Sequence, residues 1–137
     1  MESLNLVGRK ALVTGGASGI GKAAAALFAS LGANVVIADL DSDAVEKAVT
    51  ETRAIGAVAG DVSKPVDSAK IVESAVKQLS GLDAVFHCAG IHRLGLAMEQ
   101  DIESWQHVMD VNVRGTQLIC SLAAKHMPVQ GCGAIVV

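Results

Sequence analysis

Apolar positions along the chain alternate between short continuous runs and stripes with helical spacing. Continuous runs of four or five residues are typical of buried strands, whereas apolar residues that recur every three or four positions indicate helices. The runs predict strands at Lys10–Thr14, Asn34–Ala38, Ala57–Gly60, Ala84–His87 and Ala134–Val137. The stripes between them predict helices that begin near Ile20, Ala44, Ser63 and Asp101. Strand and helix therefore alternate throughout the chain.

Polar residues, glycines and prolines mark where these helices begin and end. Ser63 and Asp101 can act as N-caps, and Pro65 suits a first helical turn. The expected stops are Gly32, Gly56, Gly81 and Pro128. The stripe before Gly56 includes Ile55, so the second helix is expected to extend that far.

Strands that are apolar throughout belong to parallel sheets with helices on both faces. Right-handed crossovers then favour a Rossmann-type α/β fold with a doubly wound parallel sheet. The 137 residues suffice for one domain with one core, and 51% of them are apolar, which argues against disorder. Because natural domains rarely stop inside a buried element, the apolar end Ala134–Val137 predicts a domain, residues 1–137, truncated in strand five.

The segment Thr14–Gly21 joins the first strand to the first helix and reads TGGASGIG. Glycines let the backbone approach a pyrophosphate, which the N–H groups and partial positive charge of a helix N-terminus can bind. A flexible turn is the plainer alternative. Gly16–Lys22 also fits the start of a P-loop, but Ala23 stands where Ser or Thr should bind Mg²⁺. A GxGxxA motif at Gly19–Ala24 would begin four residues past the strand, so the longer loop fits phosphate binding best.

Asp39 follows the second strand directly, 18 residues after Gly21. A carboxylate there can accept hydrogen bonds from the ribose hydroxyls of adenosine and would repel a 2′-phosphate. No Arg stands beside it, so NAD is predicted rather than NADP. Alone, Asp39 could simply begin a turn with Asp41 and Asp43; beside the glycine loop that interpretation is the weaker one.

Composition excludes several other classes of protein. A net charge of −3 without a run of Lys or Arg provides no surface for nucleic acid. The longest uncharged run, Ala23–Ala38, is too short to cross a membrane, and no signal peptide opens the chain. Cys88, Cys120 and Cys132 are odd in number and not closely paired, which fits a reducing, cytoplasmic compartment.

Together these residues resemble the short-chain dehydrogenase/reductase family, in its branch with a TGxxxGxG loop. The similarity runs from about Leu6 to the last residue, and Thr14–Gly21 carries that loop in full. Asp61 and Val62 match the family's Asp-Val after strand three, where the Asp contacts adenine; Asn112 matches the helix Asn of its catalytic Asn-Ser-Tyr-Lys set. The resemblance implies that the cofactor is bound by Gly15, Ser18, Gly19, Ile20, Gly21, Asp39, Leu40, Asp61, Val62, Cys88, Ala89 and Gly90.

Asn112 also stands out from its position on a predicted helix. It falls on an apolar stripe made of Trp105, Val108, Met109, Thr116, Ile119 and Ala123. A polar amide on a buried face needs partners, so Asn112 is either a satisfied core residue or, as the family implies, support for a water chain to a catalytic Lys. The helix around Trp105–Met127 also resembles the one through which family members pair, which implies a homo-oligomer.

The chain departs from the family pattern in two respects. Cys88-Ala89-Gly90 stands where members usually carry Asn-Ala-Gly; the small residues still permit close approach to the cofactor, but the amide that ties neighbouring strands together is lost. Cys88 has no identified base, and with His87 and His92 it matches no zinc spacing, so neither a nucleophile nor a metal site is expected. The sequence contains no Tyr, the residue that donates the proton in this family.

The resemblance implies an NAD(H)-dependent oxidoreductase that transfers hydride between nicotinamide and a secondary alcohol or ketone. In the complete protein, Ser, Tyr and Lys would act on the substrate oxygen, while this chain would supply cofactor binding and Asn112 and could not catalyse alone. A non-catalytic NAD-binding module or truncated interaction partner is the alternative. An epimerase relative is disfavoured, because such proteins usually carry TGxxGxxG. The substrate itself stays open, with only the loop Ile91–Gln100 expected near it.

Overall fold

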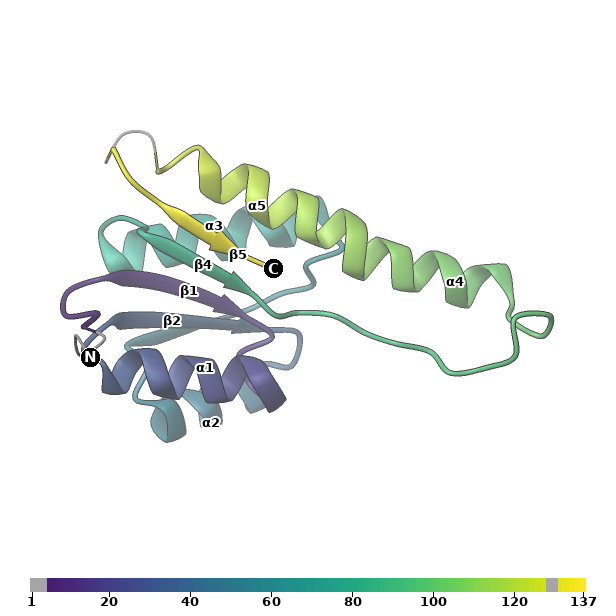
Figure 1. The fold of residues 1–137 in the computed structure, drawn as a ribbon, viewed down its shortest axis with the longest axis horizontal. Coiled ribbons are helices and arrows are strands. Elements are labelled where there is room, and N and C mark those ends of the chain that lie inside the picture. The colour runs from purple at the N-terminus through teal and green to yellow at the C-terminus, as the bar shows by residue number, and fades with distance from the viewer. Residues whose placement is uncertain (1–4, 128–130) are drawn as a thin grey trace.

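The computed structural model describes residues 5–127 and 131–137, which form a five-stranded parallel sheet with helices on both faces (Figure 1). The strands are β1 (Lys10–Thr14), β2 (Asn34–Asp39), β3 (Gly56–Ala59), β4 (Ala84–His87) and β5 (Ala134–Val136). Their order is β3-β2-β1-β4-β5, and every neighbouring pair is parallel. The expected Rossmann-type fold is confirmed. Strand order reverses between β1 and β4, and ligands of such sheets bind beyond the carboxyl ends of the strands at that point.

The helical elements are α1 (Gly19–Ser30), α2 (Ser42–Thr52), α3 (Pro65–Leu79), α4 (Ile102–Met109), the π-helical η1 (Asp110–Gly115) and α5 (Thr116–Ala124). Figure 1 shows α1 and α2 on one face of the sheet and α3 and α5 on the other. α4, η1 and α5 follow one another without a break, so that the α4 end of this rod projects beyond the sheet. Within the described ranges, no helix is long and apolar enough to span a membrane.

Successive strand residues point to opposite faces and form two separate apolar layers. The layer beneath α3 and α5 includes Leu12, Val36, Val58, Ile71, Val85 and Ile119. The layer beneath α1 and α2 includes Ala11, Val13, Ala25, Val35, Ile37 and Val45. Because both faces of the central strands are buried, each strand needs apolar residues throughout, which explains the continuous runs in the sequence.

The connection from α2 to β3 differs from the prediction. Arg53 adopts a left-handed backbone conformation with φ 61°, and α2 ends at Thr52 instead of continuing to Ile55. Ile55 is consequently 52% exposed. β3 begins at Gly56, one residue earlier than expected, which leaves Gly60 beyond the carboxyl end of the strand.

One of the two predicted N-caps is correct. Asp101 caps α4, its Oδ1 accepting a hydrogen bond from Ser104 N at 2.7 Å. Ser63 does not cap α3, because its hydroxyl donates to Asp61 Oδ1 at 2.7 Å and Lys64 occupies the N-cap position. Pro65 does lie in the first turn of α3, whereas Pro128, predicted to end the last helix, lies outside the described residues.

The buried face of the α4–η1–α5 rod also differs from the predicted stripe. Trp105 is 44% exposed because α4 extends past the sheet, and Asn112 is exposed rather than buried. A π-helical turn closes its hydrogen bonds one residue further along the chain than an α-helix, which changes the register of side chains on either side of it. Ile119 and Ala123 of the predicted stripe are buried as expected, but towards α4 the buried face continues through Gly115 and Val111 instead of Thr116 and Asn112.

Candidate functional site

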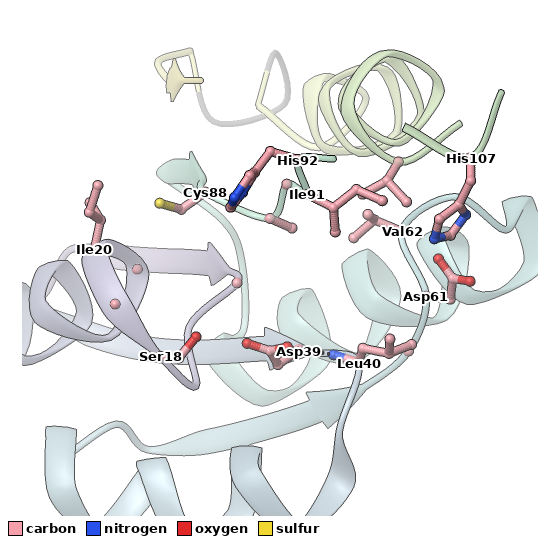
Figure 2. A pocket seen from close by; sticks show the side chains of 17 residues that line it. Ser18, Ile20, Asp39, Leu40, Asp61, Val62, Cys88, Ile91, His92 and His107 are labelled. Carbon is pink, nitrogen blue, oxygen red and sulfur yellow. Dashed lines mark hydrogen bonds between the residues drawn. The ribbon is translucent and has the colours of Figure 1, made fainter. Parts of the chain in front are cut away.

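A pocket of about 650 Å³ lies beyond the carboxyl ends of β1, β2 and β4, where the strand order reverses (Figure 2). It brings together all of the residues predicted to bind a cofactor, namely Gly15, Ser18, Gly19, Ile20, Gly21, Asp39, Leu40, Asp61, Val62, Cys88, Ala89 and Gly90. Its lining is completed by residues to which the sequence assigned no such role: Gly60, Ile91, His92, His107 and Val111.

The N-terminus of α1 forms one wall of this pocket. Among the described residues, the backbone N–H groups of Gly19, Ile20 and Gly21 make no hydrogen bond, and the first such bond of the helix runs from Lys22 N to Ser18 O at 3.0 Å. Ser18 is the N-cap residue, yet its side chain makes no capping bond. Free N–H groups at the positive end of a helix form a site suited to a phosphate.

The glycines of the loop fall into two kinds. A Cβ on Gly15, whose φ is 65°, would lie 2.8 Å from Ala89 N, and a Cβ on Gly21 would overlap the carbonyl of Gly15. These two glycines allow the loop to pack against α1 and against the segment after β4. Gly19, with φ 51°, has nothing within 4 Å of a Cβ position. The loop therefore keeps open space at Gly19, where a ligand can approach the backbone.

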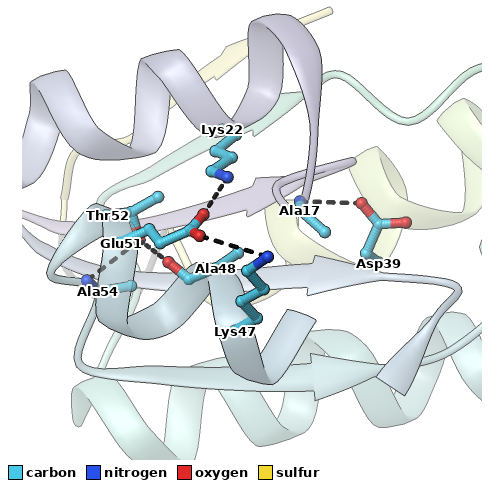
Figure 3. Close-up of polar contacts among 8 residues, drawn as sticks. All are labelled: Ala17, Lys22, Asp39, Lys47, Ala48, Glu51, Thr52 and Ala54. Carbon is cyan, nitrogen blue, oxygen red and sulfur yellow. Dashed lines mark hydrogen bonds and ion pairs between the residues drawn. The ribbon is translucent and has the colours of Figure 1, made fainter. Parts of the chain in front are cut away.

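The Asp39 carboxylate lies at the end of β2, beside the glycine loop that leads into α1. Its Oδ2 accepts a hydrogen bond from Ala17 N at 2.9 Å (Figure 3), and its Oδ1 accepts one from Leu40 N at 2.8 Å (Figure 2). Each carboxylate oxygen can accept a further bond. No Lys or Arg is among the lining residues of the pocket, so neither of these side chains balances the charge of Asp39 there.

Two lysines near the glycine loop are engaged with α2 instead. Lys22 of α1 forms an ion pair with Glu51, which also lies 3.9 Å from Lys47 (Figure 3). The hydrogen bond from Lys22 lowers the pKa of Glu51, outweighing a smaller opposing effect of burial, so the carboxylate is charged. This pair links α1 to α2 beside the pocket.

Asp61 lies on the far side of the pocket from the glycine loop. Its Oδ1 accepts hydrogen bonds from Ser63 N at 2.9 Å and Ser63 Oγ at 2.7 Å. Burial raises the pKa of Asp61, but these two bonds together with the charges of Lys64 and His107 outweigh that effect, and the pKa lies below its ordinary value. Asp61 is therefore a charged acceptor, and its second oxygen makes no hydrogen bond within the described ranges.

Thr14 fastens the ends of β1 and β4 together. Its hydroxyl lies 2.8 Å from His87 Nδ1 and accepts a hydrogen bond from Ala89 N at 3.3 Å, while its carbonyl accepts one from Cys88 N at 3.2 Å. Hydrogen bonds therefore still link the ends of β1 and β4 although Cys88 stands where the family usually carries Asn. Burial lowers the pKa of His87, and its Nε2 makes no hydrogen bond with any described residue.

Asn112 lies outside the pocket lining but holds one of its segments in place. Its Nδ2 donates to Ile91 O at 2.8 Å, and its Oδ1 accepts from Ile91 N at 2.9 Å. The amide thus pairs with both backbone groups of one residue in the loop after β4, next to Gly90. Asn112 is therefore an exposed side chain that holds the backbone of Ile91, and not an amide buried in the core.

Comparison with known proteins agrees with this arrangement. A family model described as short chain dehydrogenase matches residues 9–137. An uncharacterized oxidoreductase of Thermotoga maritima is 37% identical over 137 residues, covering 97% of this chain and 54% of the relative. An NAD-dependent glycerol dehydrogenase of Listeria innocua is 33% identical, covering 98% and 54%. The chain thus spans about half the length of these relatives.

Solved structures show the same similarity. A short-chain type dehydrogenase/reductase from Mycobacterium ulcerans superimposes with a TM-score of 0.91 at 34% identity, over 96% of this chain and 51% of the other. A short chain dehydrogenase from Burkholderia cenocepacia in complex with NADP gives a TM-score of 0.84 at 30% identity, over 90% and 52%. The fold, the glycine loop and these matches together show that the chain belongs to the short-chain dehydrogenase/reductase family of oxidoreductases.

Proposed function

We propose that this chain is the NAD(H)-binding part of an enzyme that transfers hydride between nicotinamide and a secondary alcohol or ketone. One observation carries the proposal: a single pocket at the switch point of the sheet contains both the free N–H groups of the α1 N-terminus and the Asp39 carboxylate. The first suits a pyrophosphate and the second suits the hydroxyls of a ribose.

The lining residues divide the pocket into regions with different chemistry. The pyrophosphate would be held by Ser18 and the N–H groups of Gly19, Ile20 and Gly21. The adenosine would be held by Asp39, Leu40, Asp61 and Val62, and the nicotinamide ribose by Cys88, Ala89 and Gly90. When bound, NAD supplies the nicotinamide carbon that accepts or donates hydride. The chain's own part is to bind and orient the dinucleotide, with Asn112 holding the backbone of Ile91 beside the nicotinamide end.

Charge at the ribose end supports NAD(H) over NADP(H). Asp39 lines the pocket, and no Lys or Arg is among the lining residues. A 2′-phosphate would bring two further negative charges to this end without a Lys or Arg in the lining to pair with. One relative is described as NAD-dependent and one similar structure contains NADP. The preference for NAD(H) is therefore proposed from the residues of this chain and not from its relatives.

Binding by this chain does not by itself amount to catalysis. The 137 residues contain no Tyr, so they cannot supply the phenol that exchanges a proton with the substrate oxygen in the family. We therefore propose that this chain alone binds the cofactor without turnover, which is also how a non-catalytic NAD-binding module would behave.

The projecting part of the molecule suits contact with a second copy of the chain. Leu94 and Met98 are each 93% exposed in the loop before α4, and Ile102 and Trp105 of α4 are also exposed. Figure 1 shows that this segment projects beyond the sheet. Exposed apolar side chains gathered on one such segment are typical of an association surface. We propose a homo-oligomer formed through α4 and its continuation, which light scattering coupled to size exclusion tests. A stable monomer would contradict this proposal.

The experiment that tests the cofactor proposal is a pair of calorimetric titrations with NADH and NADPH. Wild-type protein should bind NADH about tenfold or more tightly than NADPH, since one unpaired like-charge contact costs on the order of 1–2 kcal/mol. Asp39→Asn should weaken NADH binding and narrow the gap between the two cofactors. Asp43→Asn, which removes the same charge outside the pocket lining, is the matched control and should change the ratio little. Tighter binding of NADPH by wild-type protein would refute the assignment.

A further inference from the structure

We infer that His107 is a specificity residue for the base of the dinucleotide and that it acts beside Asp61 to select adenine. The inference rests on the proposed binding of NAD(H) and assigns to that site a residue that the sequence motifs leave without a role. His107 lies 46 residues after Asp61 in the chain, and only the fold brings the two side chains to the same end of the pocket.

The helical rod presents His107 to the pocket. His107 lies in the last turn of α4, and Val111 follows four residues later in η1, so the two share one face of the rod. Both line the pocket, whereas Trp105, nearer the start of α4, does not. The last turn of α4 is therefore the part of this projecting helix that reaches the site.

His107 and Asp61 act on each other electrostatically. Figure 2 shows the imidazole next to the Asp61 carboxylate, at the opposite end of the pocket from Ser18 and Ile20. The imidazole of His107 is one of the neighbours that lower the pKa of Asp61, after Ser63 and Lys64. Because Ser63 occupies Asp61 Oδ1 with two hydrogen bonds, the other carboxylate oxygen remains available to a ligand.

This pair matches the chemistry of an aminopurine. Adenine carries an exocyclic amine, which donates hydrogen bonds, next to ring nitrogens, which accept them. A carboxylate suits the amine, and an imidazole N–H suits a ring nitrogen while the flat ring also provides an apolar surface for the base. In an oxopurine a carbonyl replaces the amine, and that carbonyl would meet the Asp61 carboxylate without a proton between them.

No contact of the His107 side chain among the described residues indicates a contribution to the stability of the fold. Its side chain is exposed and makes no hydrogen bond or ion pair within 4 Å with another described residue. Removing the ring should therefore alter the pocket without weakening the fold. This separates a role in ligand selection from a role in stability.

The test compares NADH with its hypoxanthine analogue, reduced nicotinamide hypoxanthine dinucleotide, by calorimetric titration. Wild-type protein should bind NADH more tightly than the hypoxanthine analogue. His107→Ala should weaken NADH binding about fivefold and reduce the preference over the analogue, because stacking and one hydrogen bond to the base are lost. His107→Gln keeps an N–H donor and should recover part of the preference. Gln117→Ala, an exposed change on α5 outside the pocket, is the control, and urea unfolding should give all variants the same stability.

The outcomes separate this inference from the proposed function. If wild-type protein and His107→Ala bind NADH with the same affinity, or if His107→Ala weakens NADH and the analogue equally, His107 does not select the base and the inference is overturned while NAD(H) binding stands. If wild-type protein binds neither dinucleotide, the proposed function fails and the inference fails with it. A preference for NADH that shrinks only in the His107 variants supports the inference.

Discussion

Replacing Gly21 by Ala is the sharpest test of how the glycine loop is built. Gly21 lies in the first turn of α1 and is buried. An added Cβ would overlap the carbonyl oxygen of Gly15 and lie 2.8 Å from its carbonyl carbon and 3.3 Å from Gly16 N. All three atoms belong to the backbone, so no side chain can rotate away, and the loop must move relative to α1.

Two opposing effects set the expected size of the change. In an unobstructed helix, Ala instead of Gly would stabilise the protein by about 0.5–1 kcal/mol. Forcing extra volume into a packed site typically costs about 1–3 kcal/mol, and a contact with backbone alone favours the upper part of that range. We therefore expect the free energy of unfolding of Gly21→Ala to fall by about 1–2 kcal/mol, with a loss of NADH binding as the loop shifts.

Urea unfolding followed by circular dichroism measures the first effect, and calorimetry measures the second. Gly95→Ala is the matched control, because a Cβ at Gly95 meets nothing within 4 Å and its φ is not in the left-handed region. That control should change stability by less than about 0.5 kcal/mol. If Gly21→Ala is as stable as wild type or more so, helix propensity outweighs the overlap and the close packing of Gly15 on α1 is refuted.

Three further predictions concern the other parts of the site. Burial lowers the pKa of His87 below its ordinary value of 6.5, so the unfolded chain binds a proton at His87 more readily than the folded chain does. The free energy of unfolding should therefore fall as the pH drops below 6.5 and stay constant above it. In urea titrations at several pH values, His87→Gln should reduce this loss of unfolding free energy at low pH. An unchanged loss would contradict the attribution of the pH dependence to His87. Asn112→Ala removes both hydrogen bonds to Ile91 and should lower stability by about 1–2 kcal/mol and speed amide exchange at Ile91, whereas unchanged exchange would show that the clamp does not hold this loop. Finally, this chain should show no dehydrogenase turnover in a screen of alcohols and ketones, because loss of general acid catalysis costs about 10² to 10⁴ in rate; NADH production that copurifies with the chain would overturn this.

Much of the fold and of the pocket lining followed from local sequence. Continuous apolar runs and helical stripes identified all five strands and the main helices, because burial on both faces of a parallel sheet leaves few positions for polar residues. The glycine loop, Asp61 and the Cys88 segment each come after a strand, and Asp39 is the last residue of β2. Parallel strands end at the same edge of a sheet, so the glycine loop and Asp39 could be assigned to one site from their positions, whereas Asp61 and the Cys88 segment were assigned through the resemblance to the family.

Other features depended on contacts that no local pattern records. The π-helical turn in η1 directs Asn112 to the backbone of Ile91, where a regular helical stripe predicted a buried amide. Ser63 donates to Asp61 instead of capping α3, because α3 begins one residue later than expected, with Lys64 at the N-cap position. His107 reaches Asp61 only because the rod crosses the end of the sheet. Hydrophobic periodicity indicates which face of a helix or strand is buried. The hydrogen-bond partner of each polar side chain depends on where segments distant in the chain lie, and only the tertiary structure decides that.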